Sequence, residues 1–238
     1  MMYADDILLL SISATHTQKI IDLCVSVLES CDLKINPNKS CLLRIEPRHN
    51  TACNLSINSQ MIACKSEIRY LGVQIVSSNS FKCNLQLNRQ KFFQAANRVL
   101  GKIGVTAPIN LILSLIDSFC IPVLLYGLEG VGLSKCQTNS IDFAYSTIFF
   151  KLFNVKDPMT IKWCQYYTSC LPPSFRLDIR AFNFYHELSR LKSSPLSSLV
   201  NLFGNDDLAA LLNRYNNNDS NVRSFKTKVW KLFNSALL

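Results

Sequence analysis

The spacing of apolar residues changes near residue 81, and this change limits the folds open to the chain. Before residue 81, apolar residues stand in short runs or alternate with polar ones, as in 54–58, which is typical of short β-strands. From 85 to 103 they recur every three or four residues instead, which is typical of a helix with one buried face. The sequence therefore predicts an α+β chain with its strands gathered in the first third.

The strand-rich part opens with a predicted β-hairpin over residues 1–10, where two apolar runs flank a polar turn. Turns are expected at Pro37-Asn38 and at Asn58-Ser59. Gly72 lies inside one apparent strand and indicates a bulge or a close approach of another backbone. Further extended segments are predicted at 33–36, 41–45, 54–58, 61–63 and 69–75.

One helix is expected between the first hairpin and these segments, with Thr15 or Thr17 as its N-cap. Its apolar face is predicted to comprise Ile20, Cys24, Val27, Leu28 and Cys31. After residue 81 the chain is expected to be helical throughout. Beyond the helix near 85–103, helices are predicted at roughly 109–121, 123–128, 138–153, 174–192, 206–214 and 219–236.

The most apolar stretch, residues 109–133, is the one segment that resembles a membrane span. It contains Asp117, Pro122 and Glu129, and carboxylates are costly in hydrocarbon. Two buried helices broken at Pro122 account for the stretch without a membrane. The sequence therefore predicts a protein that does not span a bilayer.

The charge balance favours a polyanionic partner. Lysine and arginine total 25 against 16 acidic residues, so the net charge is +9. Such an excess favours nucleic acid or an anionic membrane surface over an acidic partner.

The ten cysteines are scattered, with no Cys-x-x-Cys pair, and no secretory signal opens the chain. Cys24 and Cys31 are expected as buried thiols on one helix face. The spacing of Cys164, Cys170 and His186 matches no compact zinc module. We therefore expect reduced, buried thiols in an intracellular protein of the nucleus or cytoplasm that is not secreted.

Asp5 and Asp6 are adjacent carboxylates in the turn of the first predicted hairpin. Nucleotidyl transfer to a primer end uses two Mg²⁺ ions, and rigidly held carboxylates suit such ions as ligands. Like charges so close also favour a cation between them. On spacing alone, a solvent-exposed acidic turn is the commoner explanation of such a pair.

The residues around this pair resemble a known motif. Tyr-Ala-Asp-Asp followed by aliphatic residues resembles motif C of reverse transcriptases, with Tyr3, Asp5 and Asp6 at the motif positions. In that family this motif binds the catalytic metals. The resemblance therefore implies Mg²⁺ as cofactor, held by Asp5 and Asp6.

Two further segments follow in the family's order. Residues 32–40 resemble motif D, a Leu-x-x-Asn-x-x-Lys pattern with Leu33, Asn36 and Lys39 in place. The family's lysine lies near the departing pyrophosphate and can act as a general acid, a role the resemblance gives to Lys39.

Residues 69–73 resemble motif E, the hairpin that grips the primer terminus, with Tyr70, Leu71 and Gly72 at the motif positions. Residues 121–127 resemble, less sharply, an Ile-x-Pro-x-x-x-Tyr-Gly segment in the thumb of non-LTR (LINE-type) retrotransposon enzymes.

The resemblance to a non-LTR reverse transcriptase implies a domain plan and a set of partners. Residues 1–80 would be the later part of the palm, 81–155 a helical thumb, and 156–238 a helical C-terminal extension. The partners would be an RNA template, a DNA primer and deoxynucleoside triphosphates, with the oligomeric state left open. Lys91, Arg98 and Lys102 share one face of the first thumb helix and would contact the duplex backbone. An ordinary solvated helix face is the alternative.

Motif A, with the aspartate that completes the two-metal site, and the Gly-rich motif B precede motif C in the family. Only two residues precede Tyr3 here, so we expect a fragment without polymerase activity of its own. A non-catalytic nucleic-acid-binding module and a membrane or scaffolding protein are the alternative functions.

The remaining aromatic residues are expected in the core. Phe92, Phe93, Phe149, Phe150 and Phe153 stand at helical spacing among aliphatic residues. Trp163, Tyr166 and Tyr167 could form a stacking patch, but packing is the default expectation for them as well.

Overall fold

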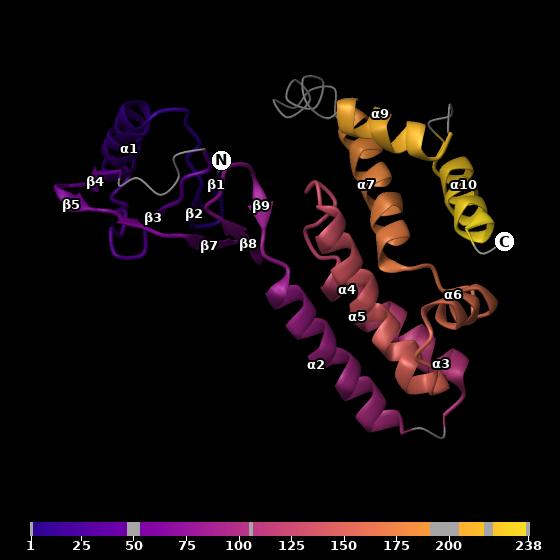
Figure 1. Ribbon diagram of the computed structural model, residues 1–238. Helices are drawn as coiled ribbons and strands as arrows, with labels where there is room; N and C mark the ends of the chain where they lie inside the picture. The colour runs from indigo at the N-terminus through magenta and orange to yellow at the C-terminus, as the bar shows by residue number, and fades with distance from the viewer. Residues whose placement is uncertain (1, 47–52, 105–106, 191–204, 217–220, 237–238) are drawn as a thin grey trace. The chain divides into compact units, whose positions relative to one another are not determined.

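Figure 1 shows the chain as a computed structural model, which describes residues 2–46, 53–104, 107–190, 205–216 and 221–236. The chain divides into two compact units, residues 1–84 and 85–238. The first, here called the strand unit, holds the described strands and one helix, and the second, the helical unit, is built of helices. The predicted α+β class is confirmed.

Short strand pairs make up the strand unit. Their bounds are β1 Met2–Tyr3, β2 Asp6–Ile7, β3 Cys41–Leu42, β4 Ser56–Ile57, β5 Gln60–Met61, β6 Ala63–Cys64, β7 Glu67–Tyr70, β8 Val73–Val76 and β9 Lys82–Cys83. The pairs β1–β2 and β4–β5 and the sheet β7–β8–β9 are antiparallel, whereas β3 pairs with β6 in parallel. The predicted hairpins at 1–10 and 54–63 are confirmed, but residues 33–36 form no strand.

The continuous strand predicted over 69–75 is wrong, because the chain reverses in its middle. Tyr70 pairs with Val73, and the two residues between them, Leu71 and Gly72, have φ angles of 46° and 86°. Positive φ at both central residues is the feature of a type I′ turn, whose twist matches that of the flanking strands. Gly72 thus marks a hairpin turn and not a bulge, as the motif E resemblance implied.

Among its described residues, the strand unit has one helix, α1, Ala14–Glu29. Its N-cap is Ser13, whose hydroxyl accepts a hydrogen bond from the His16 amide at 3.2 Å, so the predicted caps were wrong by a few residues. Ile21 is the buried residue of α1, whereas Val27 and Cys31, predicted on the buried face, are exposed. The hydrophobic core beneath α1 is small, so only a narrow strip of the helix surface is buried against it.

The helical unit contains α2 Gln86–Ile103, α3 Ile109–Leu115, α4 Ile121–Leu124, α5 Lys135–Phe153, α6 Pro158–Tyr167, α7 Pro173–Arg190, α9 Asn205–Arg214 and α10 Val222–Ser235. The helices predicted near 138–153, 174–192, 206–214 and 219–236 are confirmed within the described residues. The sequence did not predict α6, and residues 125–128 are not helical.

The predicted break at Pro122 is also wrong. A π-helical turn, Ile116–Cys120, joins α3 to α4, and the amide of Ile121 donates to the carbonyl of Ile116. Pro122 then stands in the first turn of α4. Since a proline ring clashes with the carbonyl four residues earlier in a regular helix, a widened turn just before it lets the helical path continue to Leu124.

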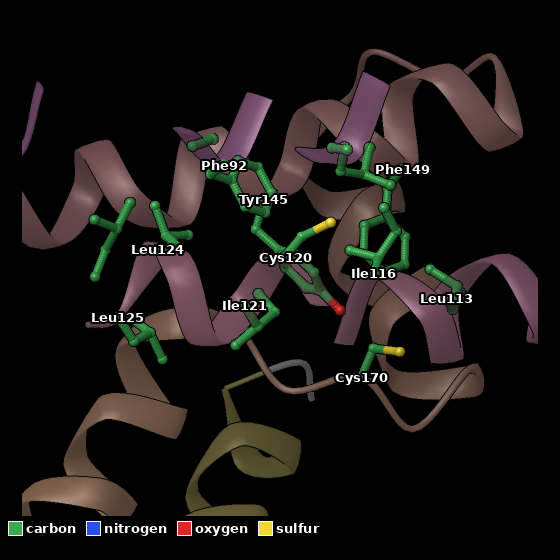
Figure 2. Packing of buried hydrophobic residues seen from close by; sticks show 14 of the residues in the cluster. Phe92, Leu113, Ile116, Cys120, Ile121, Leu124, Leu125, Tyr145, Phe149 and Cys170 are labelled. Carbon is green, nitrogen blue, oxygen red and sulfur yellow. The ribbon is translucent and has the colours of Figure 1, made fainter. Parts of the chain in front are cut away.

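Two hydrophobic clusters hold the helical unit together. The larger spans α2 to α7, and Figure 2 shows Phe92, Ile116 and Phe149 among its buried members, all at 0% exposure. It reaches Leu177, so residues on both sides of position 155 share one core. The smaller cluster joins α7, α9 and α10, with Phe182 stacked on Phe225 at 4.2 Å between ring centroids.

The carboxylates of the apolar stretch 109–133 are paired with arginines of α7. Asp117 lies 2.9 Å from a terminal nitrogen of Arg176, and Glu129 lies 2.5 Å from one of Arg180. Two arginines one turn apart on α7 therefore neutralise both negative charges of the apolar stretch 109–133. None of the helices in the described ranges combines the length and the apolar character that a membrane crossing requires.

The ten cysteines form no disulfide. Cys83, Cys120 and Cys170 are buried, and burial raises the pKa of the Cys120 thiol to about 11. The prediction of buried thiols is wrong for the exposed Cys31, Cys41, Cys64 and Cys136. These four lie on the thin strand unit and at the start of α5, where little core is available.

Candidate functional site

The Asp5-Asp6 pair lies in a tight hairpin, as the sequence predicts. Tyr3 pairs with Asp6, so Ala4 and Asp5 form a two-residue turn and Asp6 begins β2. Tyr3, Asp5 and Asp6 are exposed, with Tyr3 at 64%. The hairpin therefore presents two adjacent carboxylates to solvent on a short, antiparallel support.

The turn that carries Asp5 is strained. Ala4 has a φ of 51°, in the left-handed region where an L-residue with a Cβ pays roughly 1–2 kcal/mol. Residues held in such sparsely populated conformations concentrate at functional sites, where the strain fixes a particular geometry. The positive φ angle of Ala4 is therefore imposed by the hairpin, because alanine by itself does not favour it.

The chemistry of this pair suits a partial magnesium site. Mg²⁺ prefers oxygen ligands and is commonly held by one or two carboxylates together with substrate phosphates. Asp5 and Asp6 supply the two carboxylates. Within the described ranges, no cluster of three or more histidine, cysteine, aspartate or glutamate side chains is placed to hold a metal ion. The described residues thus offer two protein ligands, and phosphate or other groups would have to complete the coordination.

Lys39 stands in an exposed turn that Asn36 organises. The side-chain oxygen of Asn36 accepts hydrogen bonds from the amides of Asn38 at 3.0 Å and Lys39 at 3.4 Å. Its carbonyl accepts a further bond from the Ser40 amide at 3.1 Å. The asparagine of the Leu-x-x-Asn-x-x-Lys pattern therefore shapes the loop that presents the lysine.

A second contact fixes this loop and has no signal in the sequence. The side-chain amide of Gln60, in β5, donates to the side-chain oxygen of Asn38 at 2.9 Å. The two residues are far apart in the chain, so no local pattern could reveal the pairing. The interactions of the described residues do not join Lys39 to Asp5 or Asp6, although all three lie in the strand unit.

Tyr70, Leu71 and Gly72 form the tip of the β7–β8 hairpin. Tyr70 and Gly72 are partly buried, while Leu71 is 40% exposed and holds a positive φ that leucine rarely adopts. An apolar side chain is thus presented at a strained turn. Such an arrangement suits contact with a ligand better than core packing.

The basic face of α2 is exposed. Lys91, Arg98 and Lys102 all lie on the solvent side, and none of them takes part in an ion pair within the described part of the chain. On another side of α2, Lys151 of α5 donates to the side-chain oxygen of Asn97 at 3.1 Å. The stripe belongs to the helical unit, and the carboxylate pair to the strand unit.

The aromatic predictions divide into two groups. Phe92 and Phe149 are fully buried and Phe93, Phe150 and Phe153 pack against the same cluster, so their place in the core is confirmed. For the trio in α6 the packing expectation is wrong in part. Trp163 is partly buried, but Tyr166 is 37% and Tyr167 is 78% exposed.

Comparisons with known proteins give one match. Residues 1–75 match the family model described as reverse transcriptase (RNA-dependent DNA polymerase), which covers 75 of the 238 residues. The matched range includes the Asp5-Asp6 hairpin, the Lys39 loop and the Leu71-Gly72 turn. No curated protein and no solved structure gives a significant match. The strand unit is thus similar to part of a reverse transcriptase.

Proposed function

We propose that this chain is a fragment of a reverse transcriptase of the non-LTR, LINE type, whose complete form copies RNA into DNA. The observation that carries the proposal is the coincidence of the family match over residues 1–75 with a hairpin that presents Asp5 and Asp6 to solvent. The wider motif order, with Lys39 and the Tyr70 hairpin downstream, supports it. The enzyme would act inside the cell, in the nucleus or cytoplasm.

In this proposal Asp5 and Asp6 would hold Mg²⁺ through their carboxylates. The bound metal would supply electrostatic stabilisation of the phosphates during nucleotidyl transfer. Lys39, exposed on a loop shaped by Asn36, would donate a proton to the departing pyrophosphate. Tyr3 and the tip residues Tyr70, Leu71 and Gly72 would contact the primer.

The described chain alone is not expected to catalyse polymerisation. Two carboxylates on an exposed two-stranded hairpin are a partial ligand set, and β1–β2 is hydrogen-bonded to no other described strand. Precise two-metal geometry needs a rigid supporting shell around the ligands. A further polymerase segment that adds a ligand and packs on the hairpin would be required.

RNA-templated primer extension by the purified chain tests this proposal. With Mg²⁺, a DNA primer on an RNA template and all four deoxynucleoside triphosphates, we expect no multi-turnover extension. Extension that disappears in the variant Asp5→Asn/Asp6→Asn would support the reverse transcriptase and overturn its description as an inactive fragment. Extension that survives in this variant would overturn the assigned site.

A second candidate function is non-catalytic binding of a template–primer duplex. The specific observation is the exposed stripe of Lys91, Arg98 and Lys102 along α2, which forms no ion pair with any residue that the structure describes. Each phosphate that a cation neutralises contributes about −0.9 to the slope of log K against log salt. Loss of the whole stripe should therefore reduce this slope by roughly 2.7 for duplex binding.

The triple variant Lys91→Gln/Arg98→Gln/Lys102→Gln measures that change on an RNA–DNA hybrid. A matched control is Lys135→Gln, an exposed lysine at the start of α5. An equal slope for the triple variant and the wild type would remove the stripe from the interface.

A further inference from the structure

The aromatic trio of α6 forms a partly solvent-facing stack. The ring of Trp163 lies parallel to that of Tyr167, with centroids 6.0 Å apart and planes 27° apart. Tyr166 meets both rings edge-on, at 6.0 Å from Trp163 and 5.4 Å from Tyr167. Because Trp163 is anchored in the smaller hydrophobic cluster, it holds the exposed Tyr167 ring in a defined orientation.

α10 carries a basic outer face over a buried apolar one. Phe225, Val229 and Phe233 are at most 3% exposed and form part of the smaller cluster. Arg223, Lys226 and Lys231 face solvent on the same helix, and the sequences of α6 and α10 contain no acidic residue. The outer face of α10 is therefore positively charged without internal compensation.

The same cluster anchors both helices. Trp163 of α6 and Trp230 of α10 both pack against it, and Phe175 of α7 meets Phe233 of α10 at 5.5 Å between centroids. Lys162 is exposed on α6 next to the trio. Aromatic rings and cations are thus carried by one packed part of the helical unit.

We propose that α6 and α10 form a binding surface for single-stranded nucleic acid. Unpaired bases stack on the rings of Tyr166 and Tyr167, and the phosphates lie along Arg223, Lys226, Lys231 and Lys162. Single-strand binders combine these two elements, an aromatic platform and a basic track, and read little sequence. This surface is separate from the α2 stripe and does not rest on the polymerase proposal.

A membrane surface is the competing occupant, and the packing of α10 disfavours it. A helix that lies on a bilayer inserts its apolar face into the lipid. In α10 that face is already buried against α7 and the rest of the cluster. The helix therefore offers its charged face alone, which fits phosphates along a strand.

Fluorescence anisotropy with labelled 20-nucleotide oligo(dT) and oligo(U) tests the proposal on the full chain. The variant Tyr166→Ala/Tyr167→Ala should weaken binding roughly tenfold or more, since each stacked base contributes substantially. Phe119→Ala, which removes an exposed aromatic ring on the π-helical turn, should leave binding unchanged. Tyr167→Phe should retain binding, and this conservative variant separates loss of stacking from misfolding.

Two further readouts complete the test. Binding should quench the aromatic fluorescence of the wild type. Because each neutralised phosphate of a single strand contributes about 0.7 to the salt slope, Arg223→Gln/Lys226→Gln/Lys231→Gln should lower that slope by roughly 2.1. Unchanged affinity in the tyrosine variant would overturn the proposal. So would tighter binding to phosphatidylserine vesicles than to oligonucleotides, which would assign the surface to a membrane.

Discussion

The two units of the chain differ in how much core supports the residues they present. The strand unit buries Ile21, Leu55, Ile57 and Ile62 in its cluster, and most of its strands are two residues long. The helical unit buries whole aromatic rings, such as Phe92 and Tyr145, at 0% exposure. Isolated two-stranded hairpins are marginally stable in water. The polymerase-like residues thus lie in the part of the molecule with the weaker support.

The motif residues therefore lie in one unit, whereas most of the buried core that stabilises the fold lies in the other. Met2 and Tyr3 of the Asp5-Asp6 hairpin are 68% and 64% exposed, as expected for a strand pair with an uncovered surface. The helical unit has a large core and internal ion pairs, so it should remain folded when the strand unit is perturbed. Substitutions in the two units should therefore have unequal effects.

The largest effect is expected at the partly buried ionic network of the helical unit, where the side chains of Arg176 and Asp117 are 19% and 31% exposed. Arg176 donates to Asp117, to the Tyr145 hydroxyl at 3.1 Å and to the Leu171 carbonyl at 2.6 Å. Arg176→Met would leave Asp117 with the Tyr145 hydroxyl as a donor but without a cation, which should lower the free energy of unfolding by about 3–5 kcal/mol. Urea denaturation followed by far-UV circular dichroism measures this.

Two variants control that measurement. Arg214→Gln removes a pair with Asp178 in which the arginine is 61% exposed, and Asp178 keeps the hydrogen bond from the Tyr215 hydroxyl, so the change should cost about 1 kcal/mol or less. The double variant Asp117→Asn/Arg176→Met should recover part of the loss, because it removes the orphaned charge. A loss in Arg176→Met no larger than that in Arg214→Gln would contradict a stabilising role for the Asp117–Arg176–Tyr145 network.

The next effect compares one truncation in each unit. Ile116→Ala removes a side chain at 0% exposure from the larger cluster, and it should cost about 3–5 kcal/mol in the unfolding of the helical unit. Ile21→Ala removes a similar side chain from the small cluster under α1, whose surroundings relax more easily, and should cost about 2–3 kcal/mol. Hydrogen exchange resolved by residue assigns each loss to its unit. Equal losses spread over both units would contradict their independence.

A smaller effect of opposite sign is expected at the β7–β8 turn. Leu71 holds a φ of 46°, so Leu71→Gly should relieve strain and stabilise the strand unit by about 1 kcal/mol. The same change should weaken binding to a primer–template if Leu71 contacts the primer. Thermal unfolding and hybrid binding of one variant measure both, and destabilisation would show that Leu71 contributes packing.

The smallest effect is expected at Asp142, which accepts a hydrogen bond from the Ser174 amide at 2.8 Å. Burial raises the pKa of Asp142 above its ordinary value of 3.8. The hydrogen bonds from Ser174 lower the same pKa, but not enough to cancel the rise. Since the pKa of Asp142 is higher in the folded than in the unfolded chain, protonated Asp142 contributes fully to the free energy of unfolding below the unfolded pKa. This contribution is lost as the pH rises through the folded pKa.

Asp142→Asn keeps an acceptor for Ser174 and removes the buried charge. It should therefore raise stability at pH 7 by about 1 kcal/mol or less, and flatten the pH dependence of unfolding above the ordinary pKa of aspartate. Urea midpoints at several pH values measure this. A variant that is less stable than the wild type at pH 7 and equal to it at pH 4 would contradict the sign.

Local sequence patterns predicted most of the helices and hairpins, but they did not predict one helix or the path of the chain through Pro122. The hairpin at Asp5-Asp6, the turn at Asn58-Ser59 and α5 followed from turn residues and helical spacing. α6 was missed although six of its ten residues are apolar, and two of its three aromatic rings, Tyr166 and Tyr167, lie exposed. The path through Pro122 depends on a widened turn, which no residue preference signals.

In the candidate site, only contacts between residues close together in the chain could be predicted from the sequence. Asn36 and Lys39 stand in one loop, so their relation could be inferred from a short pattern. The bond from Gln60 to Asn38 and the pairing of Asp117 with Arg176 join distant segments, and a single sequence cannot reveal them. The exposure of Tyr167 depends on how α6 packs, which spacing leaves undetermined.

The central claim is that the Asp5-Asp6 hairpin is a partial catalytic metal site. Titration of the ¹⁵N-labelled chain with Mn²⁺, a paramagnetic substitute for Mg²⁺, tests it most directly. The account predicts selective broadening of the amide signals of residues 3–7, competed by Mg²⁺ and absent in Asp5→Asn/Asp6→Asn. Broadening that leaves residues 3–7 unaffected, or that persists in this variant, would contradict the claim.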